Sequence, residues 1–177
     1  MSLNQPWEDK KVEKTDWDPL KNMAEMQGRY LYDFPRPSVT ADMIVLSKSS
    51  FGTPYVLLIK RGNEPYKGCW ALPGGFLDMN ETLQHCAVRE LSEETGIELS
   101  KDVNIFGVGT FDRVNRDPRG RVIASAFKVY IDKNEYKIKA GDDAKEVKWF
   151  NMNKLPELAF DHKDIIEKAS GNLLGLY

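Results

Sequence analysis

The sequence has few cysteines, no long apolar run and no excess of charge of either sign. Its 177 residues include two cysteines, Cys69 and Cys86, which form no Cys-x-x-Cys pair and share no nearby histidine. This spacing fits neither a zinc motif nor a secreted disulfide framework, so both thiols are expected to be reduced packing residues. A net charge of −2 excludes a global basic field that would attract nucleic acid or an anionic membrane.

Membrane insertion and secretion are not indicated either. The longest apolar runs, such as 43–46 and 55–59, are far shorter than the ~20 residues that span a bilayer. The polar N-terminus contains no apolar stretch typical of a secretory signal. We therefore expect a cytoplasmic protein that has no membrane or nucleic-acid partner.

Residues 1–37 are predicted to form an N-terminal arm, and residues 38–177 a single folded domain. The arm is polar and charged and contains a possible short helix near 20–27. It ends at Pro35 and Pro37, which favour extended or turn backbone. A chain of this length buries most of its apolar surface in one core without disulfides or structural metal.

Strand and helix signals then follow one another along the domain. Runs of β-branched and aliphatic residues predict strands at 38–47, 55–60, 103–110, 122–131 and 147–150. A helix is predicted near the C-terminus, at 161–170. Another helix is predicted from about 81 to 95, because Leu83, Ala87 and Leu91 recur at i, i+4 and i+8 and Gly96 can cap its C-terminus. This order favours an α/β fold with a mixed sheet covered on both faces.

The predicted helix carries acidic residues in an unusual arrangement. On a helix of 3.6 residues per turn, Glu90 and Glu94 lie one above the other, and Glu93 lies one step round. This row borders the apolar stripe, so the acids are expected to be partly buried. At an effective dielectric near 20, two carboxylates about 6 Å apart then repel each other by roughly 3 kcal/mol. A bound hard cation would relieve that repulsion, and oxygen-only ligation suits Mg²⁺ or Mn²⁺.

A purely structural interpretation of these acids is also available. Acid-rich runs are common on solvated helix faces, where Arg89 and Glu93 at i, i+4 would form a weak ion pair. The flanking residues decide between the two interpretations.

From Gly75 to Ile97 the sequence fills every fixed position of the pattern GX₅EX₇REUXEEXGU, in which U is an aliphatic residue. It resembles the Nudix box, and nine specified positions over twenty-three residues make a chance match very improbable. The wider resemblance extends from about Ser38 to Ser170 and includes the Leu72-Pro73-Gly74-Gly75 segment that precedes the box.

The resemblance implies an α/β/α sandwich in which Glu90, Glu93 and Glu94 hold one or more divalent cations, Mg²⁺ or Mn²⁺. It further implies that Glu81 and Arg89 brace this site. Water attacks a phosphorus of a diphosphate in such enzymes, and the metal neutralises charge on the phosphates. Glu93 is the leading candidate for the general base. An acid of a later loop takes this role in some related enzymes, and the candidates here are Asp142, Asp143 and Glu146.

Residues outside the box bear on the substrate. Four arginines lie between residues 113 and 121, in a segment that resembles Nudix proteins that act on or sense ADP-ribose, and residues 158–162 resemble a late motif of that group. Arginine binds phosphate through its bidentate fork, and an aromatic side chain can stack on adenine. The residues expected to bind substrate are Gly74, Gly75, Arg61, Arg116 and Arg119, and the candidates for stacking are Trp70, Phe111 and Phe160.

Each of these assignments has a structural alternative. The Arg-Asp-Pro-Arg turn can be held by its own Asp–Arg pairing, aromatic residues are most often core, and His85 and His162 are expected to be surface or capping groups. The expected reaction is hydrolysis of ADP-ribose to AMP and ribose 5-phosphate by a homodimer. The alternatives are a pyrophosphohydrolase for a nucleoside triphosphate or nucleotide sugar, and a non-catalytic ligand sensor. Only seven residues follow Ser170, so a DNA-reading module is not expected.

Overall fold

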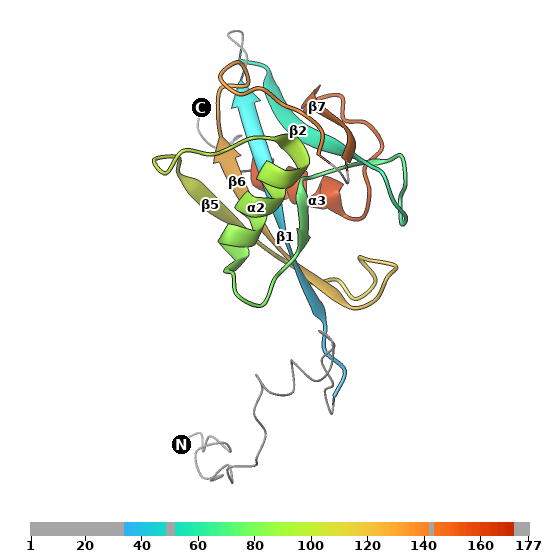
Figure 1. The fold of residues 1–177 in the computed structure, drawn as a ribbon. Coiled ribbons are helices and arrows are strands. Elements are labelled where there is room, and N and C mark those ends of the chain that lie inside the picture. The colour runs from blue at the N-terminus through green and yellow to red at the C-terminus, as the bar shows by residue number, and fades with distance from the viewer. Residues whose placement is uncertain (1–33, 49–51, 142–143, 172–177) are drawn as a thin grey trace, which may run out of the picture. The chain divides into compact units, whose positions relative to one another are not determined.

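The computed structural model describes residues 34–48, 52–141 and 144–171. The elements in chain order are β1 (Ser38–Lys48), β2 (Pro54–Arg61), β3 (Trp70–Ala71), β4 (Gly74–Phe76), α2 (Leu83–Thr95), β5 (Ile105–Phe111), β6 (Val122–Tyr130), β7 (Ala144–Asn151) and α3 (His162–Ser170) (Figure 1). Neither α2 nor α3 is long and apolar enough to cross a membrane. The helix predicted near 20–27 lies outside the described residues.

The strands form one seven-stranded mixed sheet. Five of them lie in the order β3-β2-β1-β6-β5, and β4 and β7 join the sheet beside β1 and β2. Strand β1 pairs in parallel with β6, and every other pairing is antiparallel. The start of β1 also pairs with β4, whereas its end pairs with β2, which continues away beside β7. Strand β1 thus has different neighbours along its length, and β4 leads from it into the segment before α2.

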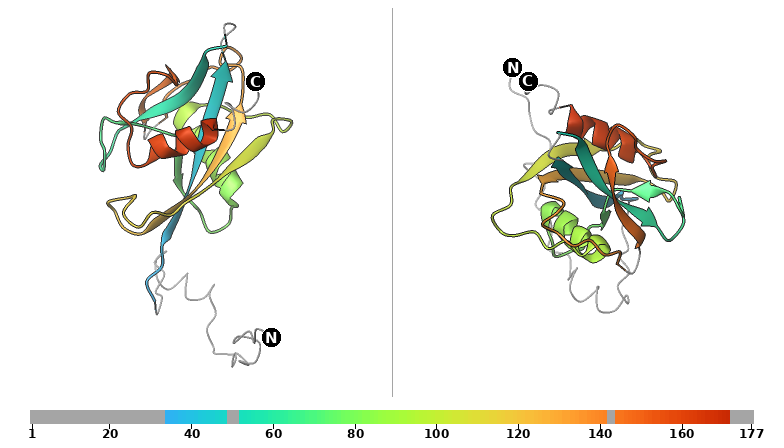
Figure 2. Two further views of the ribbon diagram at one scale, coloured as in Figure 1. Left: turned by 180° about the vertical axis from the view of Figure 1, so that it is seen from behind. Right: turned by 90° about the horizontal axis from the view of Figure 1, so that it is seen from above.

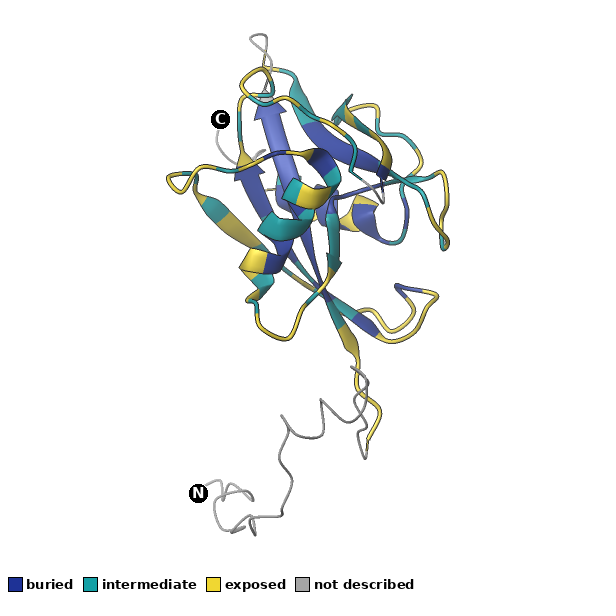
Figure 3. Cartoon of the chain, viewed as in Figure 1, coloured by how far each residue is buried: buried dark blue, intermediate teal, exposed yellow. Residues whose placement is uncertain are grey.

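The two helices cover opposite faces of the sheet (Figure 2). Side chains alternate along a strand, so Met43 and Val45 of β1 pack in the cluster that contains α2, and Ile44 and Leu46 pack in the cluster that contains α3. Figure 3 shows the resulting buried centre of the sheet between two partly exposed helices. The predicted α/β fold with a mixed sheet covered on both faces is therefore confirmed.

Helix α2 begins and ends where its capping residues require. The Thr82 side chain accepts a hydrogen bond from the His85 amide at 3.2 Å, and Gly96 ends the helix at a φ of 69° with its amide bonded to the Ser92 carbonyl. Within the helix, Ala87 and Leu91 of the predicted stripe are buried. Cys86 is buried beside them, and burial raises the pKa of its thiol to about 12, as expected for a packing residue.

Most element boundaries differ from the sequence prediction by one or two residues, and the larger differences lie at β3, β4 and β7. Strands β3 and β4 were not predicted, because they contain two and three residues and show no alternation. Strand β7 begins at Ala144, so the prediction that Glu146 lies in a loop is wrong. Glu146 pairs with Lys60 of the neighbouring strand, both in the backbone register and through an ion pair of 3.8 Å. Asp142 and Asp143 lie outside the described residues.

Candidate active site

The two glycines of β4 are required by close approaches. A Cβ atom on Gly75 would overlap the Glu90 carboxylate, and one on Gly74 would lie 2.5 Å from Asp42 Oδ1 and 2.6 Å from the Ala41 carbonyl oxygen. The Gly74 amide donates to Glu94 Oε2 at 3.0 Å. The missing side chain of Gly75 therefore makes room for the Glu90 carboxylate, and that of Gly74 makes room for the neighbouring strand β1.

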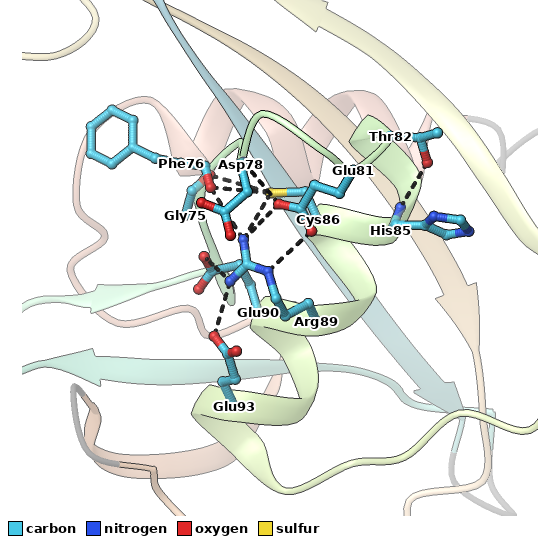
Figure 4. Close-up of polar contacts among 10 residues, drawn as sticks. All are labelled: Gly75, Phe76, Asp78, Glu81, Thr82, His85, Cys86, Arg89, Glu90 and Glu93. Atoms are coloured by element: carbon cyan, nitrogen blue, oxygen red, sulfur yellow. Dashed lines mark hydrogen bonds and ion pairs between the residues drawn. The ribbon is translucent and has the colours of Figure 1, made fainter. Parts of the chain in front are cut away.

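Arg89 forms ion pairs with three acids of the box, Glu81, Glu90 and Glu93 (Figure 4). It contacts Glu81 through Nε and Nη2 at 3.1 and 2.8 Å, and its Nη1 donates to Glu90 at 2.8 Å and to Glu93 at 2.9 Å. These hydrogen bonds raise the pKa of Arg89 and lower the pKa of Glu81 to about 2. Nη2 also donates to the Phe76 carbonyl, which ties the helix to β4.

The three acids predicted to bind metal do not have equal surroundings. Glu90 and Glu94 line one cleft, where burial raises the pKa of Glu90 and raises that of Glu94 to about 8. Glu93 does not line this cleft. Its side chain is 58% exposed and bonded to Arg89, which is the i, i+4 pair considered in the structural interpretation of the helix.

The donor set fits a hard divalent cation, although the acids are not gathered into a ready site. Across residues 34–48, 52–141 and 144–171, no three His, Cys, Asp or Glu side chains are grouped so that they could hold a metal ion. Arg89 occupies part of the space between Glu81, Glu90 and Glu93. Glu90 and Glu94 nevertheless supply half-buried carboxylates whose pKa burial raises, and a bound Mg²⁺ or Mn²⁺ would stabilise their charged form.

Two arginines face these acids across the cleft, which has a volume of about 410 Å³. The guanidinium of Arg119 lies 4.8 Å from the Phe76 ring and 5.4 Å from the Phe160 ring, and that of Arg61 lies 4.9 Å from the Phe160 ring. Burial and the neighbouring Arg119 lower the pKa of Arg61. Two crowded cations are thus placed where an anion would stabilise both.

The other predicted substrate-binding arginine is held by an acid. Arg116 donates to Asp161 through Nε at 2.9 Å and Nη2 at 2.5 Å, and its side chain is 3% exposed. Arg119 makes a similar but more exposed pair with Asp117, at 3.0 and 2.7 Å. The internal pairing that the sequence offered as an alternative therefore exists at Arg119, and Arg116 is paired with a residue that sequence spacing does not reveal.

Two of the three candidate stacking residues are core side chains. Trp70 packs edge-on against Phe150 at 4.5 Å, and Phe111 packs against the cluster that contains α3. Phe160 instead lines a small cavity that adjoins the cleft. It adopts a φ of 53°, an uncommon conformation for a residue with a side chain, and so directs an aromatic ring toward the arginines.

His162, predicted to be a surface or capping group, is buried, so the surface alternative is wrong. Its Nδ1 accepts a hydrogen bond from the Leu72 amide at 2.8 Å, an acceptor role that requires the neutral ring with its proton on Nε2. Burial, together with Arg116, lowers the pKa of His162 to about 3. The histidine therefore helps to hold the chain before β4 in place.

This burial predicts a specific pH dependence of stability. Below pH ~6.5 the unfolded chain takes up a proton at residue 162, whereas the native state resists it until about pH 3. The contribution of His162 to the free energy of unfolding is therefore fully present above pH ~6.5 and is lost as the pH decreases toward 3. His162→Asn keeps an acceptor for Leu72 but cannot titrate, so its free energy of unfolding, measured in urea, should decrease less over this range. His85→Asn, at an exposed position, is the control; equal pH dependence in His162→Asn and the wild type would contradict the prediction.

Sequence reasoning missed Asp42, which lies in the middle of β1. It is buried, and burial raises its pKa to about 7. The available signal was an acid inside a strand whose neighbours Ala41, Met43, Ile44 and Val45 are all apolar. Nothing in the box pointed to it, because strand β1 precedes the box in sequence and reaches the site only through its pairing with β4.

Comparison with known proteins identifies the class to which this fold and site belong. Residues 36–169 match the family model described as the NUDIX domain. The chain therefore belongs to the Nudix family of hydrolases, as the box indicates.

Several similar proteins have names or descriptions that mention ADP-ribose. The chain is 46% identical over 131 residues to the ADP-ribose pyrophosphatase of Methanocaldococcus jannaschii, which covers 74% of this chain and 72% of that protein. It is 36% identical over 145 residues to the ADPR responsive transcriptional repressor NtrR of Acinetobacter baylyi, covering 80% of this chain and 56% of the repressor. The solved NUDIX domain of Shewanella oneidensis NrtR, complexed with ADP ribose, has a TM-score of 0.71 at 29% identity and covers 85% of this chain and 97% of that chain.

Proposed function

We propose that this protein hydrolyses ADP-ribose to AMP and ribose 5-phosphate with Mg²⁺ or Mn²⁺ as the cofactor. The observation that supports this most is the composition of the cleft. The half-buried carboxylates of Glu90 and Glu94 and the guanidiniums of Arg61 and Arg119 line the same cleft. A diphosphate together with a divalent cation would balance both sets of charges at once.

The relatives support the same substrate. One is named an ADP-ribose pyrophosphatase, and a solved neighbour was obtained with ADP ribose. The cleft volume of about 410 Å³ also lies within the ~300–1,000 Å³ usual for small-molecule sites.

The residues of the site would have distinct roles. Glu90, Glu94 and Glu93 would hold the cation, which neutralises charge on the diphosphate. Arg89 and Glu81 would position these acids through their shared hydrogen bonds, and Gly74 and Gly75 would leave room for the substrate beside them. Glu93 is the proposed base, because its carboxylate is exposed. When the hydrogen bond to Arg89 is broken, this carboxylate could accept the proton of the attacking water.

A substrate panel tests this proposal. ADP-ribose, NADH, diadenosine polyphosphates, nucleotide sugars and nucleoside triphosphates should be compared with Mg²⁺, with Mn²⁺ and after exhaustive chelation. We expect ADP-ribose to have the highest kcat/KM and chelation to abolish turnover. A nucleoside triphosphate with about tenfold higher kcat/KM, or ~1.4 kcal/mol in transition-state binding, would overturn the substrate assignment. Full turnover without metal would overturn the mechanism, and tight binding without turnover would indicate a sensor.

Arg119→Ala should raise KM for ADP-ribose by about tenfold and change kcat little, if Arg119 holds a phosphate equally in the ground and transition states. Arg113→Ala is a matched control, because Arg113 lies in the same loop but pairs with Asp164 away from the cleft. Steady-state kinetics provide the measurement. An unchanged KM would leave Arg119 with only its contacts to Asp117, Phe76 and Phe160.

We further propose a cytoplasmic homodimer to which residues 1–37 contribute part of the interface. This proposal follows only from the resemblance to Nudix proteins that act on ADP-ribose. Light scattering at micromolar concentration should give the mass of two chains, and a monomer would contradict the prediction. No nucleic-acid partner is proposed; specific binding of duplex DNA in a mobility-shift assay would contradict this part.

A further inference from the structure

Asp42 is a buried acid of the site, and one of its carboxylate oxygens has no hydrogen-bond partner among the described residues. Its residue exposure is 5%, and within the part of the chain that the structure describes, its Oδ2 is the one buried side-chain oxygen or nitrogen without a hydrogen-bond partner. A buried polar atom without a partner destabilises the folded state. A ligand contact would explain why an acid stands at this position of β1.

The side chain faces a small cavity of about 60 Å³. Asp42, Thr40, Arg116 and His162 line it, none of which lines the larger cleft. The two spaces share the following lining residues: Ile59, Arg61, Gly74, Gly75, Phe76 and Arg119. A substrate whose diphosphate lies beside the arginines can therefore extend one end toward Asp42. The cavity has room for a few water-sized groups and is too small for a purine.

The groups around this cavity define what it can bind. Arg116 presents only donors, and its Nη1 is not used in the pair with Asp161. His162 also presents a donor, because its Nδ1 accepts from Leu72 and the proton is on Nε2. Asp42 presents an acceptor in its unpartnered Oδ2. A group between them must donate to the carboxylate and accept from a nitrogen.

A hydroxyl group has both properties. A phosphate oxygen only accepts and cannot donate to Asp42, whereas an ammonium only donates and would be repelled by the arginines that line the cavity. We propose that Asp42 determines specificity by accepting a hydrogen bond from a hydroxyl of the sugar that the substrate carries beyond its diphosphate. This inference rests on the proposed function, and it assigns the small cavity to the ribose that leaves as ribose 5-phosphate.

Two substrates that differ only in hydroxyl groups test the inference. ADP-ribose is compared with the ADP ester of tetrahydrofurfuryl alcohol, which has the same ring and diphosphate but none of the three hydroxyls of the terminal ribose. The wild type should prefer ADP-ribose by about 10- to 100-fold in kcat/KM, the usual effect of a hydrogen bond to a charged group. In Asp42→Asn and Asp42→Ala this ratio should fall toward one. Asp102→Asn, at an exposed turn, should retain the wild-type ratio.

The remaining outcomes separate this inference from other roles of Asp42. If the wild type hydrolyses both substrates equally, or if the variants lose both activities with an unchanged ratio, the inference is wrong while the proposed function stands. A shifted dependence of the rate on Mg²⁺ concentration in Asp42→Asn would assign the acid to the metal instead. If the wild type hydrolyses neither ester, the proposed function and the inference both fail.

Discussion

Glu94→Gln is expected to lower kcat for ADP-ribose by about 100-fold or more while leaving the protein folded. The substitution removes a charge proposed to hold the cation but almost no volume, and its amide oxygen can still accept from the Gly74 amide. Because burial already raises the pKa of Glu94 to about 8, the metal-free variant should have a melting temperature equal to or above that of the metal-free wild type.

The test combines steady-state kinetics at saturating Mg²⁺ with thermal unfolding in chelator. Glu135→Gln is the control, since the same substitution at an exposed turn should change neither quantity. Equal kcat in Glu94→Gln and the wild type would contradict the proposed metal site. A large fall in melting temperature would show instead that Glu94 is a structural acid.

Arg116→Ala should destabilise the protein by about 3–5 kcal/mol, the largest stability effect expected of any arginine in the loop. Its side chain and that of Asp161 are 3% and 4% exposed, and the substitution leaves the Asp161 carboxylate buried without its partner. The loop between β5 and β6 also loses its buried ion pair with the residue that precedes α3, whereas the exposed pair of Arg113 and Asp164 remains.

Urea unfolding of Arg116→Ala measures this effect, and a second variant identifies its cause. Replacing the pair together, as Arg116→Met with Asp161→Leu, should recover most of the lost stability, because no unpaired charge remains. Arg119→Ala is the matched comparison and should cost less, since its partner Asp117 lies in the same turn and the arginine is partly exposed. Wild-type stability and a raised KM in Arg116→Ala would contradict this prediction and would indicate that Arg116 binds the substrate.

The sequence predicted the parts of the site that depend on local chemistry. The spacing of Glu81, Arg89 and Glu90 within one box identified the family, and Gly96 marked the helix end at the residue where the structure ends it. These features depend on neighbouring residues, so a single helix period and one glycine suffice to place them.

Residue pairings across the fold could not be read from the sequence. Four arginines in one loop look equivalent, but only Arg116 is buried, because Asp161 lies 45 positions away in sequence and adjacent to it in space. Asp42 and His162 were missed for the same reason. Asp42 reaches the site through strand pairing, and His162 contacts the chain before β4 through a hydrogen bond between residues 90 positions apart, which the resemblance of residues 158–162 did not reveal.

The close packing of Gly75 against Glu90 affects how inactive family members should be recognised. A methyl group at position 75 would occupy the space of the Glu90 carboxylate and push that acid out of the cleft, although every glutamate of the box would remain in the sequence. Counting acidic residues would classify such a protein as active. With the proposed role of Glu90, a replaced glycine at this position therefore predicts reduced activity even in a protein that keeps every acid of the box.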